Sequence, residues 1–175
     1  MIRVSNSVTI KRPREAVYAF WRQLENLPRF MYHLQGVRST ESGRSHWVAR
    51  APAGQQVEWD AEIVDDRPGE MLAWRALPGS DIRHEGSVRF TAAPSDRGTE
   101  VEVTLQYDAP GGKAGALIAS MFGEEPTQQI RDDLRRFKQV METGEVLRSE
   151  GSLEGPGQGP LEQRAAQAPA TEVRR

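Results

Sequence analysis

Three histidines, His33, His46 and His84, are the side chains of this sequence that titrate near neutral pH without help from their surroundings. They lie far apart and no two of them are four residues apart, so the sequence does not indicate a histidine-rich metal site. His84 stands in the run 81–85, Asp-Ile-Arg-His-Glu, at the expected start of a strand. A general base there would need a nucleophile or a partner, and the sequence shows neither. We therefore predict no catalytic residue, no metal site and no cofactor.

The composition excludes several other kinds of chemistry. The 175 residues contain no cysteine, which rules out disulfides, thiolate nucleophiles and cysteine-ligated metals. The net charge of −2 gives no broad basic field, so we predict no nucleic-acid partner. No apolar run approaches the roughly 18 residues of a membrane-spanning helix, and the N-terminus lacks the apolar core of a signal peptide. We expect a soluble, cytoplasmic protein.

Acidic residues alternate with apolar ones in two segments. The acidic members are Glu58, Asp60, Glu62, Glu100 and Glu102. Period 2 places them on the outer face of half-buried antiparallel strands. We predict that they are solvated and that Arg75 and Arg89 pair with them, so they do not serve as acid–base groups.

The same alternation recurs along most of the chain and predicts an antiparallel sheet. Expected strands cover residues 3–11, 34–41, 45–51, 57–64, 71–76, 81–92 and 101–107, and two short helices are expected at 13–24 and 25–30. A long helix is expected from about residue 114 to 143, with a break near 123–126 at Pro126. Its apolar stripe is Ile130, Leu134, Phe137 and Met141. The charged residues of this helix are expected on its outer, solvated face, with Asp132 and Arg136 as an i, i+4 pair. They are Arg131, Asp132, Asp133, Arg135, Arg136 and Lys138.

This order of elements predicts an α+β fold. A curved antiparallel sheet of about six or seven strands would wrap around the long C-terminal helix, with the two short helices after the first strand. Such a helix laid across a concave sheet leaves a gap that can hold a ligand. Residues 148–175 are rich in glycine and proline and lack aromatic residues, so we predict a folded domain over 1–147 and a disordered C-terminal tail over 148–175.

Aromatic and apolar side chains are the candidates for the wall of that gap. The expected strands supply Trp47, Trp59, Trp74, Phe90 and Tyr107, and the first half of the long helix supplies Leu117, Ile118, Met121 and Phe122. The alternative is that these side chains fill a solid core.

The segment 111–126 is small, apolar and rich in glycine before it reaches Pro126. Glycine lowers helix stability, which suits a flap over the mouth of a pocket. A transient contact with a membrane surface through Leu117, Ile118, Met121 and Phe122 is a second interpretation, and a plain connector with buried small residues is a third.

Residues 2–145 resemble the START-like (SRPBCC) helix-grip superfamily, and within it the polyketide cyclase/dehydrase and ubiquinone-binding branch. The residues that carry the likeness are 6–10, 13–18, Trp21, 26–31, Trp47, 57–63, 67–70, Trp74, 86–90, 98–101 and 134–138. The resemblance implies a helix-grip fold with an internal cavity. Members include lipid carriers, quinone binders, hormone receptors, aromatase/cyclases and chaperone co-factors, so the likeness does not fix an activity. No catalytic fingerprint of the family is present to carry over.

Three functions follow from these observations. The first is binding or transport of a hydrophobic small molecule, such as a lipid, an isoprenoid quinone or a polyketide-like compound, in the cavity. The alternative is a polyketide cyclase/dehydrase-type enzyme, with His84, Arg83, Tyr107 and Asp81 as candidate polar groups. The third is a ligand-free protein whose tail binds a partner. The sequence favours a non-enzymatic binder and leaves the oligomeric state open.

Overall fold

The computed structural model describes residues 2–80, 82–108 and 126–144. Its strands are β1 (Ile2–Ile10), β2 (Leu34–Ser39), β3 (Arg44–Arg50), β4 (Gln56–Arg67), β5 (Met71–Ala76), β6 (His84–Ala92) and β7 (Thr99–Tyr107). Its helices are α1 (Arg14–Arg22) and α3 (Pro126–Thr143), with 3₁₀ turns η1 (Leu24–Arg29), η2 (Glu41–Gly43), η3 (Pro52–Gly54) and η4 (Pro94–Asp96).

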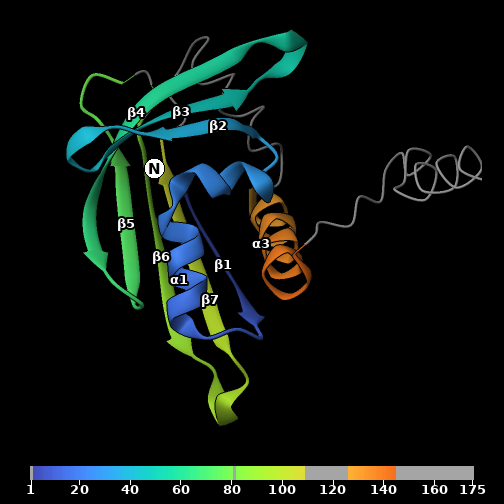
Figure 1. Cartoon of the computed structure of the whole chain (residues 1–175). Coiled ribbons are helices and arrows are strands. Elements are labelled where there is room, and N and C mark those ends of the chain that lie inside the picture. Colours follow the sequence, from blue (N-terminus) through green and yellow to red (C-terminus); the bar gives the residue numbers. More distant parts are fainter. Residues whose placement is uncertain (1, 81, 109–125, 145–175) are drawn as a thin grey trace, which may run out of the picture.

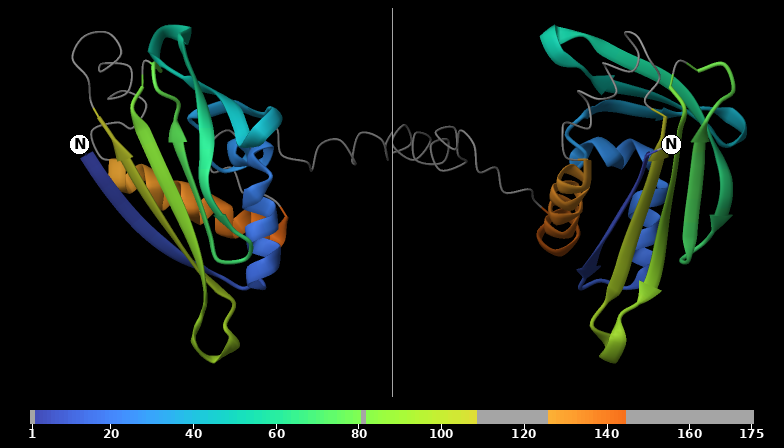
Figure 2. Two further views of the ribbon diagram at one scale, coloured as in Figure 1. Left: turned by 90° about the vertical axis from the view of Figure 1, so that its left-hand side faces the viewer. Right: turned by 180° about the vertical axis from the view of Figure 1, so that it is seen from behind.

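The strands form one antiparallel, seven-stranded sheet in the order β1-β7-β6-β5-β4-β3-β2. Strands β2 to β7 follow one another as a meander, and β1 is added beside β7. The chain therefore crosses from one edge strand to the other between β1 and β2, and α1 and η1 make that crossing. Both α1 and α3 lie within the curve of the sheet (Figures 1 and 2).

Alternation along the strands creates the inner face. On β7, Val101, Val103, Leu105 and Tyr107 are buried, and the residues between them are more exposed. Strand β6 is in register with it, so that Phe90 lies opposite Val101 and Val88 opposite Val103. This period of two is what a sheet with one face on the core requires.

Aromatic rings join α1 and α3 to each other and to the sheet. The Trp21 ring on α1 lies 5.1 Å from the Phe137 ring on α3 and 6.4 Å from the Phe90 ring on β6. Phe30 lies 4.6 Å from Phe137, measured between ring centroids. The predicted stripe on α3 is confirmed, because Ile130, Leu134, Phe137 and Met141 are all buried.

The predicted α+β helix-grip fold is therefore confirmed. The short helix expected at 25–30 is the 3₁₀ turn η1, and the second half of the expected long helix is α3, while residues 114–125 lie outside the described residues. The expected cross-strand ion pair of Arg75 forms with Glu62 at 2.8 Å. Within the described ranges, no helix is both long and apolar enough to cross a membrane.

One expectation about α3 is wrong. The charged residues of this helix, Asp133 among them, were expected on its outer face, yet Asp133 is only 5% exposed. It pairs with Arg136, whereas the sequence suggested a pair between Asp132 and Arg136. The reason is helical phase: position 133 is three residues after Ile130 and four before Phe137, and both spacings place it on the apolar face.

Candidate ligand-binding cavity

A small cavity lies between the inner face of the sheet and α3. Its wall includes Trp47 on β3, Trp59 on β4, Trp74 on β5, Leu105 on β7 and Leu134 on α3. Its volume is about 30 Å³, which is room for about two water molecules. The structure thus shows a narrow space within a largely packed interior.

The three tryptophans of this wall form a stack across neighbouring strands. Trp47 lies directly opposite Trp59 in the pairing of β3 with β4, and their rings are 5.8 Å apart with planes 24° from parallel. Trp74 lies 6.2 Å from Trp47, with planes 20° from parallel. Flat aromatic surfaces therefore make up much of the sheet side of the cavity.

The backbone of β6 makes room for Trp74. A Cβ atom on Gly86 would lie 2.3 Å from Cζ2 of the Trp74 ring, closer than real atoms approach. Glycine at this position lets the indole lie flat on the strand.

The indole N–H groups of the stack differ in their partners. Trp47 Nε1 donates a hydrogen bond to Ser45 Oγ at 2.8 Å. Trp59 Nε1 and Trp74 Nε1 are buried and have no hydrogen-bond acceptor within the described part of the chain. Such groups are uncommon in protein interiors because each unmade hydrogen bond costs roughly 1–3 kcal/mol.

Polar groups from three separate segments meet at the same cavity. His33 follows η1, His84 begins β6, and Gln129 and Asp133 lie on α3. The Gln129 amide nitrogen lies 3.0 Å from His33 Nδ1 and donates to it when the imidazole carries its proton on Nε2. Asp133 Oδ2 lies 3.9 Å from the same nitrogen.

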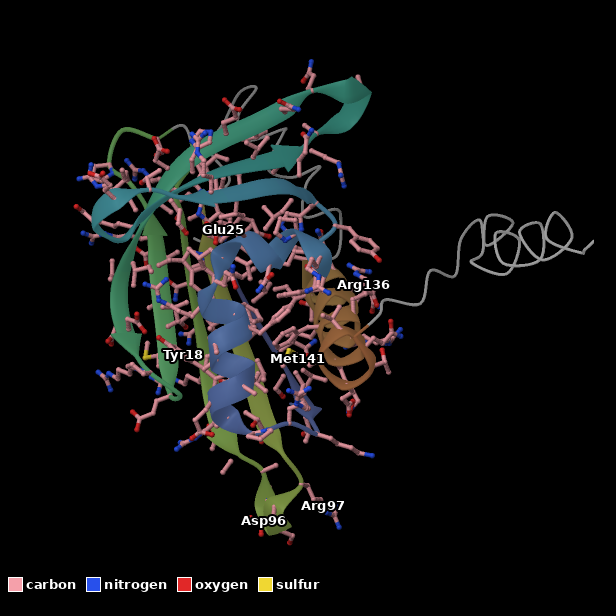
Figure 3. All side chains as sticks on the ribbon, in the orientation of Figure 1. Tyr18, Glu25, Asp96, Arg97, Arg136 and Met141 are labelled. Atoms are coloured by element: carbon pink, nitrogen blue, oxygen red, sulfur yellow. The ribbon has the colours of Figure 1, made fainter. Side chains whose placement is uncertain are left out.

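Arg136 fixes the position of Asp133. Its guanidinium donates hydrogen bonds to Asp133 Oδ1 and, at 2.9 Å, to the carbonyl oxygen of Phe30. It also lies 4.0 Å from the centre of the Tyr32 ring, a cation–π distance. Figure 3 shows Arg136 on the side of α3 that faces η1.

Burial sets the charge of these groups. It lowers the pKa of His33 and of His84 to about 4, with the charges of His84 and Arg136 adding to the effect at His33. It raises the pKa of Asp133 to about 7, against the opposing attraction of Arg136. Near neutral pH the two imidazoles are therefore neutral, and Asp133 exchanges a proton. These are the properties of groups that can give or take a proton from a bound molecule.

The predicted site residues divide into three groups. Trp47, Trp59 and Trp74 line the cavity. Phe90 is buried beside Tyr18 and Trp21, and Tyr107 is buried opposite His84 in the sheet, but neither is among the described lining residues. Leu117, Ile118, Met121 and Phe122, like the whole segment 111–125, lie outside the described residues.

Of the polar candidates, only His84 reaches the cavity among those described. The Arg83 side chain is 83% exposed and lies 3.8 Å from Asp108, and Asp81 is outside the described residues. Sequence reasoning missed His33, Gln129 and Asp133. The helical phase of Asp133 was a usable signal, but nothing in the sequence brings His33 to α3.

Among the residues that the structure describes, no three His, Asp or Glu side chains are placed to hold a metal ion. The cavity also has no lysine or arginine among its described lining residues.

Comparison with known proteins agrees with the fold. An uncharacterized 17.2 kDa protein of Streptomyces lincolnensis is 29% identical over 142 residues, which are 81% of this chain and 91% of that protein. The crystal structure of DR_A0006 from Deinococcus radiodurans is 43% identical, with a TM-score of 0.68 over 82% of this chain and 99% of that one. The Zhui aromatase/cyclase from Streptomyces sp. R1128 shares the fold, with 13% identity and a TM-score of 0.62 over 83% of this chain and 99% of that one.

The resemblance to the helix-grip superfamily is thus confirmed. A family model that matches the chain names one family within it. Residues 10–135, well over half of the sequence, match the family described as polyketide cyclase / dehydrase and lipid transport. The chain belongs to this polyketide cyclase/dehydrase and lipid transport family.

Proposed function

We propose that this protein binds, and carries, a hydrophobic small molecule between its sheet and α3. The observation that supports the proposal most directly is the narrow cavity with a wall of three stacked tryptophans. Aromatic walls with a few convergent polar groups are typical of small-molecule sites. A lipid, an isoprenoid quinone and a polyketide-like compound are the ligands that the sequence suggested, and membership of the family supports this range.

The size of the cavity determines how binding would occur. Ligand sites usually enclose about 300–1,000 Å³, whereas this cavity has about 30 Å³. Uptake therefore requires the wall to move apart, and part of the free energy gained from burying apolar ligand surface would offset that movement. Met31 in the lining is a flexible side chain that can repack around a ligand.

Native mass spectrometry of the freshly purified protein, with extraction and identification of any bound molecule, tests this proposal. We expect a co-purifying hydrophobic molecule. The variant Ile130→Phe, which adds bulk to the cavity wall, should carry less of it. Val64→Phe adds bulk at a residue that is 49% exposed and should carry as much as the wild type. A bare protein mass, together with failure to bind any aromatic or acyl-chain probe added at high concentration, would overturn the proposal.

A cyclase/dehydrase-type enzyme is a second candidate function, and the polar end of the cavity favours it. Ring closure with loss of water needs a base that removes a proton next to a carbonyl and an acid that protonates the leaving oxygen. Asp133, His33 and His84 lie at the cavity and are of the right type. Incubation with a poly-β-ketone thioester, which also cyclises slowly without a catalyst, separates the candidates. An enzyme accelerates cyclisation above this background, and Asp133→Asn abolishes the acceleration but not binding. A carrier does not raise the rate.

A further inference from the structure

Two buried indole donors in the cavity wall lack a hydrogen-bond acceptor among the described residues. Trp59 and Trp74 are 6% and 3% exposed, and neither indole nitrogen has an acceptor in the described part of the chain. Trp47 is nearly parallel to both rings, and an indole N–H lies in its own ring plane, so neither N–H points at the face of Trp47. A buried donor in this situation calls for an explanation, and a missing ligand is one.

The other two tryptophans have different surroundings from Trp59 and Trp74. Trp47 lines it too, but its N–H is already bound to Ser45. Trp21 also lacks a hydrogen-bond acceptor in the described ranges, yet it is not among the described lining residues of the cavity. The Phe137 and Phe90 rings stand edge-to-face with it. An aromatic face can act as a weak acceptor for an indole N–H. Among the four indoles, the unmet donors at the described cavity wall are therefore those of Trp59 and Trp74.

The charges around the cavity restrict the ligand further. The described lining contains no lysine or arginine, and the one ionisable acid, Asp133, already has Arg136 as its partner. An anionic headgroup placed here would meet no permanently charged cation in the described lining and would face a carboxyl group. The site therefore suits a neutral molecule.

We propose that the ligand is a neutral, flat, conjugated molecule whose carbonyl or phenolic oxygens accept hydrogen bonds from the Trp59 and Trp74 indoles. The inference rests on the proposed function and narrows it. Of the ligand types suggested by the sequence, a keto-aromatic or quinone ring fits, whereas an acyl chain or a fatty acid does not. When the ligand is absent, water in the cavity would accept hydrogen bonds from the same donors. A ligand without an acceptor would displace this water without replacing its hydrogen bonds, and its affinity would be lower for that reason.

Three probes of similar shape test the proposal by titration calorimetry: 1,4-naphthoquinone with two carbonyl oxygens, naphthalene with none, and the anion 2-naphthoate. The absence of cysteine removes the usual thiol reaction of quinones. We expect naphthoquinone to bind more tightly than naphthalene, and naphthoate to bind more than about a hundredfold more weakly than naphthoquinone.

The decisive quantity is the ratio of naphthoquinone to naphthalene affinity in Trp→Phe variants. Trp59→Phe and Trp74→Phe should each lower this ratio about fivefold, the usual net effect of one hydrogen bond. Trp47→Phe makes the same change of size in the same wall but removes a donor already bound to Ser45, so the ratio should not change. Trp21→Phe removes an unmet donor outside the cavity and should not change it either.

A second measurement does not depend on whether the Trp59 and Trp74 variants fold. In ¹H–¹⁵N spectra of the wild type, naphthoquinone should shift the indole protons of Trp59 and Trp74 downfield more than naphthalene does. The Trp47 and Trp21 variants supply the assignments of the other two indoles.

The outcomes separate the two proposals. Equal ratios in all four variants, with the probes still binding, would overturn the acceptor hypothesis and leave the proposed function standing. Tight naphthoate binding would overturn the requirement for a neutral ligand. Failure of every probe to bind would count against the proposed function and would remove this inference with it.

Discussion

Asp133 and the two buried histidines make stability respond to pH in opposite directions. The pKa of Asp133 rises from 3.8 to about 7 on folding, so between these values the folded protein holds a proton that the unfolded chain has lost. Its contribution to the free energy of unfolding is present at low pH and is lost as pH rises through about 7. His33 and His84 have pKa values lowered from 6.5 to about 4, so their contribution is lost as pH falls through that interval.

We predict that Asp133→Asn removes the part of the free energy of unfolding that decreases as pH rises. The free energy of unfolding of the variant, relative to the wild type, should increase as pH rises from 3.8 to about 7, because only the wild type pays for a buried carboxylate. Urea denaturation across that interval measures the difference. Glu102→Gln, at an exposed residue on the outer face of β7, is the control and should give a much flatter difference. A pH-independent difference for Asp133→Asn would contradict the prediction.

At the scale of elements, the contact between β5 and β6 depends on the absence of one side chain. We predict that Gly86→Ala destabilises the protein by about 1–3 kcal/mol, because the new Cβ forces Trp74 to move within a packed interior. It should also weaken ligand binding, because Trp74 lines the cavity. Urea denaturation followed by tryptophan fluorescence measures the first effect and calorimetry the second.

The matched control for that change is Gly36→Ala on β2. A Cβ there meets nothing within 4 Å, and Gly36 has no positive φ, so the free energy of unfolding should change little. Equal effects at the two glycines would show that loss of glycine flexibility, rather than the contact with Trp74, governs the result.

The elements were predictable because their signals are local. Strict alternation marked β4 and β7, and the spacing of Ile130, Leu134, Phe137 and Met141 marked α3. The fold class followed from the order of these elements. The site was predictable only in part: the three cavity tryptophans came from their strand phase, whereas the meeting of His33 with Asp133 depends on how η1 packs against α3. Contacts between residues 100 positions apart leave no local pattern in a single sequence.

At the scale of the whole molecule, the domain boundary inferred from composition stays a prediction. We predict that a chain ending at residue 147 has the same urea midpoint as the full chain, and that its free energy of unfolding depends on urea with the same slope. The reason is that residues 148–175 offer few large apolar side chains to bury. It should also bind naphthoquinone with unchanged affinity. A smaller urea dependence in the truncated chain would show that the removed residues bury surface, and the boundary would have to move towards the C-terminus.

The tryptophan stack also has an optical consequence. Three indoles held nearly parallel, with neighbouring ring centres 5.8 and 6.2 Å apart, are close enough for their electronic transitions to couple. Exciton coupling of this kind gives a circular-dichroism signal whose sign and size depend on the angle and separation of the rings. Any event that moves the cavity wall apart alters both, so the protein's own absorption would record the opening of the cavity without an added label.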